Sequence, residues 1–75
     1  MKPSIGRIVH YQSYGTPGGE YLAEPRAAVI TALVDGHDHG YVGLAVFNPT
    51  GMFFHTEVPF SADPKPGHWS WPPRV

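Results

Sequence analysis

Glycine and proline interrupt this chain so often that they limit its secondary structure. Nine of each occur in 75 residues, and residues 26–35 (RAAVITALVD) form the one run of ten that contains neither. That run is rich in Val, Ile and Thr, whose branched side chains favour strands over helices. The sequence therefore predicts short strands joined by turns, and no helix.

Five segments carry strand signals, and residues 6–11 (GRIVHY) show the alternation of a half-buried strand. Between the first two strands, residues 12–25 (QSYGTPGGEYLAEP) hold several turn-forming pairs and predict one long loop. The five predicted strands are residues 6–11, 26–35, 41–48, 52–58 and 68–72. This pattern predicts an all-β fold, a small five-stranded SH3-like barrel, as a single domain over residues 1–75.

Both tryptophans, Trp69 and Trp71, lie in the last seven residues, where chains usually fray. In an SH3-like barrel the first and last strands lie side by side, so we expect the tail to pair with residues 7–11. Residues two apart in a strand project to the same face. We therefore expect both rings to be ordered and at least one to pack on the core.

Composition excludes several classes of protein. The chain has no cysteine, which excludes disulfides and cysteine-based zinc sites. Five Lys and Arg stand against six Asp and Glu, so binding of nucleic acid through its phosphates is not expected. The start MKPSIGRIVHY has no signal-peptide pattern, and the longest apolar run, residues 27–34, is too short to span a membrane. We expect a cytosolic protein.

Four stretches resemble a family of small uncharacterised proteins of tailed phages and prophages. They are residues 3–11 (PSIGRIVHY), residues 26–31 (RAAVIT), residues 44–51 (LAVFNPTG) and the ending VPF followed by PGHWSWPPRV. The family's ending runs closer to Pro-Gly-Thr-Trp-His-Trp-Pro, whereas this chain has His68 and Ser70 at the Thr and His positions. The resemblance implies a phage or prophage origin and a setting in the host cytoplasm. It implies no catalytic mechanism.

The segment DGHDHG (residues 35–40) looks the most like a metal site, because His37 and His39 can point the same way beside two aspartates. A zinc site needs at least three well-placed ligands, and His10, His55 or His68 would have to supply the third. The Asp-Gly start and closing Gly40 are typical of a hairpin turn. We therefore expect a turn, with no metal and no cofactor, and keep a metal-dependent hydrolase as the weakest alternative.

Catalytic motifs are not recognisable elsewhere. None of the serines lies in a strand-turn-helix elbow or at a recognisable spacing from a His and an acid, and no Gly-rich loop opens a helix. The sequence therefore predicts a protein that is not an enzyme.

Ten aromatic residues are more than a barrel of this size can bury. We expect Phe47, one of Phe53 or Phe54, and one tryptophan in the core, and the others facing a partner or ligand. Residues 27–34 are apolar on both faces of their strand, which predicts a homo-oligomer whose outer sheet face is covered by another copy. The alternative is that the long loop or the tail covers this face.

Arginines and histidines near the aromatic end complete a candidate binding surface. Each could instead be a surface group, with the arginines paired to Glu24 or Glu57. His68 belongs to the same polar group. The predicted ligand-binding residues are Arg7, His10, Tyr11, Arg26, His55, Trp71 and Arg74. Aromatic rings beside cations suit a planar anionic ligand such as a nucleotide.

Three functions remain open from the sequence. The leading hypothesis is a non-enzymatic, homo-oligomeric phage binding module, in concrete form a sponge that sequesters a nucleotide-derived immune signal of the host. The second is a structural or interaction accessory of the virion or its assembly, which would use the same apolar face. The third is the hydrolase with His37 and His39.

Overall fold

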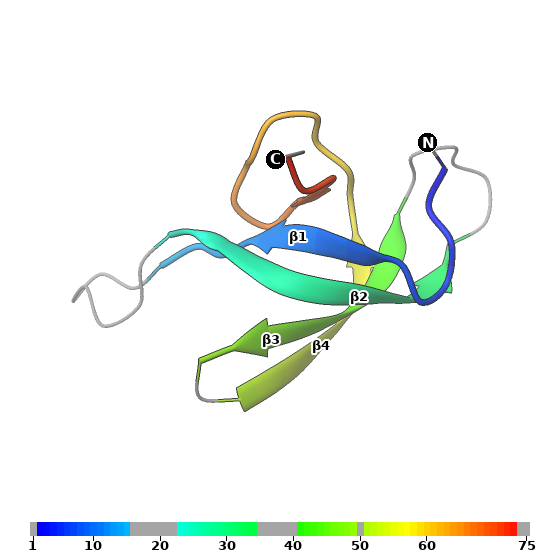
Figure 1. The fold of residues 1–75 in the computed structure, drawn as a ribbon, viewed down its shortest axis with the longest axis horizontal. Helices are drawn as coiled ribbons and strands as arrows, with labels where there is room; N and C mark the ends of the chain where they lie inside the picture. The colour runs from blue at the N-terminus through cyan, green and yellow to red at the C-terminus, as the bar shows by residue number, and fades with distance from the viewer. Residues whose placement is uncertain (1, 16–22, 35–40, 50, 74–75) are drawn as a thin grey trace.

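Five strands and their connections make up the described part of the chain, which comprises residues 2–15, 23–34, 41–49 and 51–73 of a computed structural model (Figure 1). No helix occurs in these residues. The strands are β1 (Ile8–Gln12), β2 (Pro25–Leu33), β3 (Val42–Asn48), β4 (Gly51–Val58) and β5 (Trp69–Ser70). The predicted all-β, five-stranded fold is confirmed.

The strands form one antiparallel sheet in the order β4-β3-β2-β1-β5. The first and last strands are neighbours, as expected for an SH3-like barrel, and Tyr11 of β1 pairs with Trp69 of β5. Gln12 pairs with Pro25, so the long connection between β1 and β2 runs over residues 13–24, slightly shorter than predicted. Residues 16–22 of this loop lie outside the described part.

The segment that follows β4 partly closes the open sheet into a barrel-like shape, because it is hydrogen-bonded to β5. Trp69 N donates a hydrogen bond to Pro59 O at 2.9 Å, and Ser61 N donates to Trp69 O at 2.9 Å, which places Phe60 and Trp69 in a parallel bridge. β5 is thus bonded to β1 on one side and to the continuation of β4 on the other. Figure 1 shows this continuation arching over β1 to reach the C-terminal segment.

Trp69 fills the interior between these two partners and is 0% exposed. Its ring meets Phe60 edge-on at 4.8 Å and Trp71 edge-on at 5.1 Å between centroids. The other buried members of the core come from all four longer strands: Val9, Tyr11, Ala28, Ile30, Val42, Leu44, Val46 and Val58. The expectation that at least one tryptophan packs on the core is confirmed. The closing strand is shorter than the predicted residues 68–72, because β5 comprises only Trp69–Ser70 and Trp71 follows it.

A β-bulge in β2 interrupts the regular alternation of buried and exposed residues along that strand. Ile30 pairs with Leu44 and Ala32 pairs with Gly43, so Thr31 is an extra residue on β2. Such a bulge changes which face the later side chains occupy. Ala28 and Ile30 are buried, but Ala32 beyond the bulge is exposed.

Phe47, Phe53 and Phe54 lie outside the core, so their predicted burial is wrong. Phe47 is 44% exposed because Val42, Leu44 and Val46 occupy the inward positions of β3 and leave Phe47 on the opposite face. Phe53 pairs with inward-facing Val46 but is 52% exposed, while Phe54 points outward. The interior is filled by Trp69 and short aliphatic side chains instead.

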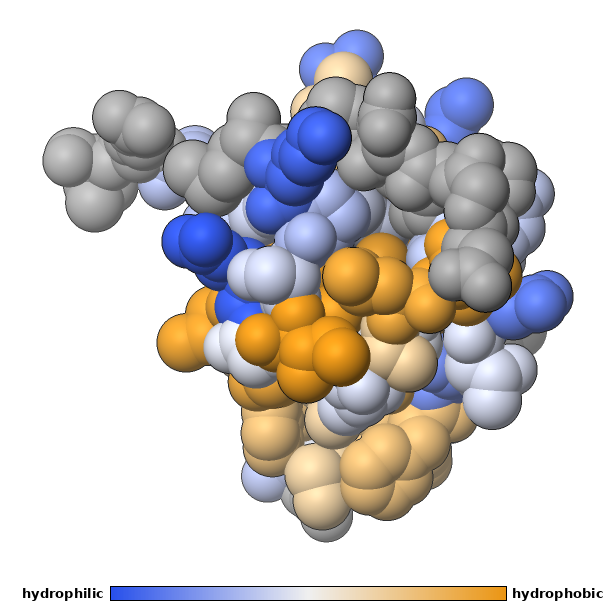
Figure 2. Space-filling model, turned by 90° about the vertical axis from the view of Figure 1, so that its right-hand side faces the viewer, coloured by the Kyte–Doolittle hydropathy of each residue, from blue (hydrophilic) through white to orange (hydrophobic). Residues whose placement is uncertain are grey.

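The outward face of the sheet is apolar, as the two-sided pattern of residues 27–34 indicates. Cross-strand pairing places Ile8, Val29, Ala45 and Phe54 in one row across β1 to β4. The described part of the chain leaves this face exposed. Residues 16–22 of the long loop and the last two residues lie outside that part, so covering by the loop or the tail stays an open alternative. Figure 2, which views the molecule from the right-hand side of Figure 1, shows apolar side chains gathered over the centre and lower part of that side.

A search for a helix with the length and hydrophobicity to span a bilayer finds none in the described residues.

Replacing Trp69 by Ala should lower the free energy of unfolding by about 3–5 kcal/mol, because the change leaves a large cavity between β1 and residues 59–61. Phe53→Ala serves as the control, since Phe53 is half exposed and should cost far less. Chemical denaturation of both variants measures the difference. Equal losses of unfolding free energy in the two variants would contradict the assigned role of Trp69 in closing the fold. A truncated chain that lacks residues 67–75 and still unfolds at the parent's temperature would contradict it as well.

Candidate functional site

A pocket of about 340 Å³ opens beside Trp71. Its described lining combines the ring of Trp71 with three prolines, one alanine and two polar residues: His10, Pro25, Ala62, Pro64, Ser70 and Pro73. The volume is at the lower end of the range for small-molecule sites, and the apolar lining with few polar groups is typical of them. We take this pocket as the candidate site and call it the Trp71 pocket.

Four separate parts of the chain position these walls, among them the connection between β4 and β5, which supplies Ala62 and Pro64. β1 supplies His10, which pairs directly with Ser70 of β5, and β2 begins at Pro25. Trp71 follows β5 and leans edge-on against the buried Trp69 ring at an interplanar angle of 85°. Because Trp69 is fixed in the core, the ring of Trp71 is held in place from behind.

The lining chemistry favours a flat ring over a charged group. An indole face stacks on planar rings, and proline rings add apolar walls with little conformational freedom to lose. His10 and Ser70 can offer hydrogen bonds to the edge of such a ring. No Asp, Glu, Lys or Arg lines the pocket in the described part of the chain.

A second group of predicted residues lies on the inward face of the sheet. Tyr11 stacks on His55 with ring centroids 4.9 Å apart and an interplanar angle of 20°. Tyr11 also pairs across the strands with Arg26. The structure thus brings Tyr11, His55 and Arg26 into one neighbourhood, separate from the residues that line the Trp71 pocket.

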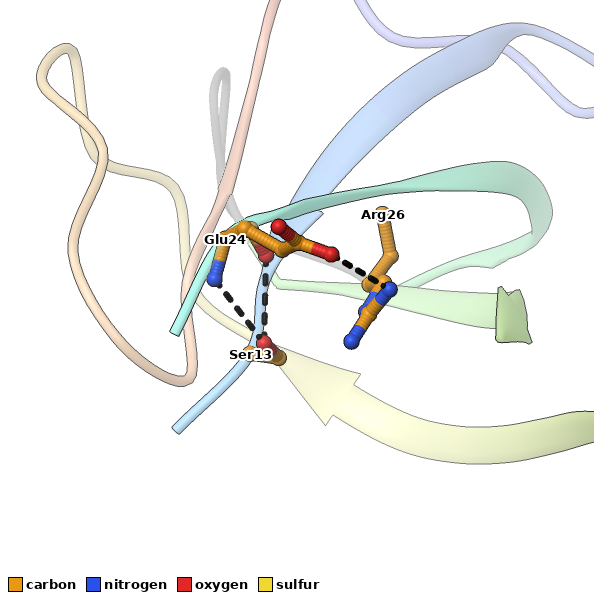
Figure 3. Close-up of polar contacts among 3 residues, drawn as sticks. All are labelled: Ser13, Glu24 and Arg26. Atoms are coloured by element: carbon orange, nitrogen blue, oxygen red, sulfur yellow. Dashed lines mark hydrogen bonds and ion pairs between the residues drawn. The ribbon is translucent and has the colours of Figure 1, made fainter. Parts of the chain in front are cut away.

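Arg26, Glu24 and Ser13 form a group of polar contacts at the base of the long loop, which we call the latch (Figure 3). Arg26 Nη1 donates a hydrogen bond to Glu24 Oε1 at 2.8 Å, and this ion pair has a guanidinium side chain only 8% exposed. Ser13 Oγ donates to Glu24 O and accepts from Glu24 N, each at 3.1 Å. These bonds tie residue 13 to residue 24 and close the loop at its stem.

The pairing of Arg26 with Glu24, one of the two partners considered from the sequence, is therefore confirmed, although Arg26 is buried rather than on the surface. Its Nε is buried without a hydrogen-bond partner in the described residues. The guanidinium charge consequently depends on Glu24 for its compensation. Arg26 acts in this structure as an anchor for the loop.

Glu24→Gln should lower the free energy of unfolding by about 1–2 kcal/mol, because it leaves the buried guanidinium of Arg26 without its counter-charge. The loss stays modest because the side chain at position 24 is partly exposed to solvent, which weakens the ion pair in the parent. Glu57→Gln on the exposed part of β4 is the matched control and should stay within about 0.5 kcal/mol of the parent. Urea denaturation at neutral pH measures both. Equal effects of the two changes would show that the latch contributes nothing specific.

Burial raises the pKa of the Tyr11 hydroxyl above its ordinary value, and the nearby Tyr14 adds to this increase. The folded protein therefore keeps the Tyr11 proton to a higher pH than the unfolded chain does. The contribution of Tyr11 to stability is fully present below the pKa that its hydroxyl has in the unfolded chain. This contribution is lost as the pH rises through the higher pKa of the folded protein.

The free energy of unfolding should accordingly fall as pH rises above about 10, and Tyr11→Phe should make that fall shallower. Denaturant titrations of the parent and the variant at a series of alkaline pH values measure the two slopes. Identical slopes would contradict the assignment of this pH dependence to Tyr11.

The seven predicted ligand-binding residues do not converge on one cleft. His10 and Trp71 line the Trp71 pocket, whereas Tyr11, Arg26 and His55 form the inward group. Arg7 is exposed and lines an open hollow of about 510 Å³ with Ser4, Ile5, Gly6 and Ile8. Arg74 lies outside the described residues.

Metal binding finds no support in the described part of the chain, which contains no group of three or more His, Asp or Glu placed to hold an ion. His55 is stacked on Tyr11, and His68 Nδ1 lies 3.0 Å from Pro66 O. The segment DGHDHG, with His37 and His39, lies outside the described residues, so its expected turn stays a prediction.

The sequence analysis did not predict the prolines that line the pocket or the hydrogen bonds between Ser13 and Glu24. Pro25, Pro64 and Pro73 are spread over almost fifty positions and meet only because β5 returns beside β1. Ser13 and Glu24 flank the long loop, and their distance in sequence gives no sign of contact. The predicted pairing of the first and last strands is the one signal in the sequence that bears on the contact among the prolines.

Comparison of the chain with protein-family models, curated proteins and solved structures gives no match.

Proposed function

We propose that this chain is a non-enzymatic binding module that works in several copies and holds the planar base of a nucleotide-derived ligand in the Trp71 pocket. In its concrete form the protein is a phage or prophage sponge that sequesters a nucleotide-derived immune signal in the host cytoplasm. The observation that carries the proposal is the Trp71 ring, backed by the buried Trp69 and surrounded by three prolines and His10.

The geometry of this pocket supports binding more than catalysis. Ser70 is buried beside His10, but no carboxylate from the described residues joins them. Nucleophilic catalysis commonly needs a base that a third group orients. Stacking on an aromatic ring needs only a flat ligand, and it contributes about 1–3 kcal/mol per base in proteins that bind nucleotides in single strands.

The phage origin and the host setting rest on the resemblance of residues 3–11, 26–31 and 44–51 and of the C-terminal tail to the tailed-phage and prophage family. Both tryptophans of the tail motif have distinct places in the structure: Trp69 is buried in the core, and Trp71 lines the pocket. The motif therefore combines a structural residue with a candidate binding residue.

Heating the purified protein should release a nucleotide-type ligand, identified by mass spectrometry, and the emptied protein should bind that ligand in calorimetry. Trp71→Ala should weaken binding by roughly 5- to 150-fold, the equivalent of one lost stacking contact. Phe53→Ala, which removes a half-exposed ring away from the pocket, should leave affinity unchanged. Thermal unfolding of both variants checks that each is folded at the temperature of the assay.

Retention of full affinity by Trp71→Ala would contradict the assignment of the site. A protein that releases no ligand and binds no member of a nucleotide panel would contradict the nucleotide class itself.

A structural or assembly role is the second candidate, and the exposed apolar face of the sheet favours it. Ile8, Phe47, Met52 and Phe54 are all about half exposed or more, which is typical of surfaces that contact other proteins. Under this alternative the protein would bind a phage partner with that face and bind no nucleotide. The nucleotide panel therefore separates the two functions.

A further inference from the structure

The outward face of the sheet carries two neighbouring rows of apolar side chains. Strand pairing aligns Ile8, Val29, Ala45 and Phe54 across four strands, and it aligns Ala27, Phe47 and Met52 in the next row. We call these seven residues the outer patch. None carries a charge, and His10 pairs with Ala27 at its border with the Trp71 pocket.

The large members of the patch are exposed, so the described part of the chain does not cover this face. Ile8 is 63%, Phe47 44%, Met52 49% and Phe54 69% exposed. Ala45, which pairs with Val29 and Phe54 in its row, is 7% exposed but does not belong to the core cluster. The patch is therefore a continuous apolar surface.

We propose that a second copy of this chain packs its own outer patch against this one, so that two sheets lie face to face. This inference deepens the proposed self-association and rests on that part of the proposed function. It assigns the contact to β1–β4 and places the Trp71 pocket at the rim of the interface, since His10 belongs to the pocket and borders the patch.

The shape of the patch suits a copy of itself. In the row of Ile8, Val29, Ala45 and Phe54 the smaller residues lie on the central strands, and in the next row Ala27 lies beside the larger Phe47. The patch thus offers small residues beside projecting side chains. In a pair of identical faces, each copy can place its projecting rings over the small residues of the other.

The area agrees with a weak but specific dimer. Aromatic side chains bury about 150–250 Å² each, so the exposed parts of the four large residues amount to on the order of 400 Å². Two such patches in contact bury on the order of 800–1,000 Å², close to the lower limit for specific interfaces. The absence of charge on the patch also means that like charges do not oppose each other in such a pair.

β4 offers a matched pair of variants to test this arrangement. Phe53 and Phe54 are adjacent and both more than half exposed, but they point to opposite faces of the sheet. Phe54→Glu places a charge in the outer patch, and Phe53→Glu places the same charge on the other face. Met52→Glu is a second variant within the patch, and circular dichroism with thermal unfolding confirms that each variant is folded.

Sedimentation at tens of micromolar should give the parent and Phe53→Glu a mass near twice the 8.2 kDa of one chain. Phe54→Glu and Met52→Glu should sediment as single chains, with the dissociation constant raised at least about tenfold. A parent that is strictly monomeric would overturn this inference together with the proposed self-association.

An assembled parent whose Phe54→Glu and Met52→Glu variants remain assembled would overturn the assigned face alone. Dissociation by Phe53→Glu as readily as by Phe54→Glu would do the same. Ligand binding at Trp71 is measured separately by calorimetry, so its result identifies which part of the proposal has failed.

Discussion

The burial of Trp69 between two strand partners is the interaction on which the rest of this structure depends. Its backbone is bonded to Pro59 and Ser61, and Tyr11 of β1 pairs with it on the other side. Its side chain is wholly buried. A chain of 75 residues without disulfides has a small core, so one large side chain provides a substantial share of the apolar area that folding removes from water.

The sequence predicted the four longer strands to within about two residues at each end, because turn residues bound them closely, whereas the fifth is shorter than predicted. The adjacency of first and last strands followed from the fold class, which placed the C-terminal tryptophans beside β1. Burial of individual aromatics could not be predicted in the same way. Phe47 lies on a strand whose two faces are both apolar, and only the register with β2 and β4 decides which of them faces inward. The bulge at Thr31 has no signal in the sequence either.

The candidate site was predicted in part. His10 and Trp71, which the sequence analysis grouped, line one pocket because the pairing of the first and last strands brings them together. Arg26 was placed with them on the basis of its charge, but a residue that faces inward becomes part of the interior, and its charge is then compensated locally by Glu24. Position along the sequence does not reveal which face a cation occupies when both faces of the strand are apolar.

The pocket and the core share one pair of rings, and this connects binding to folding. Trp71 rests edge-on against Trp69, whose position is fixed by strand pairing on both sides. A ring held from behind in this way loses little further freedom when a ligand stacks on its open face, which lowers the entropic cost of binding. The same closure that compensates for the small core therefore also preorganises the candidate site. Under the proposed function, the two tryptophans thus have different roles: Trp69 closes the fold, and Trp71 forms a wall of the pocket.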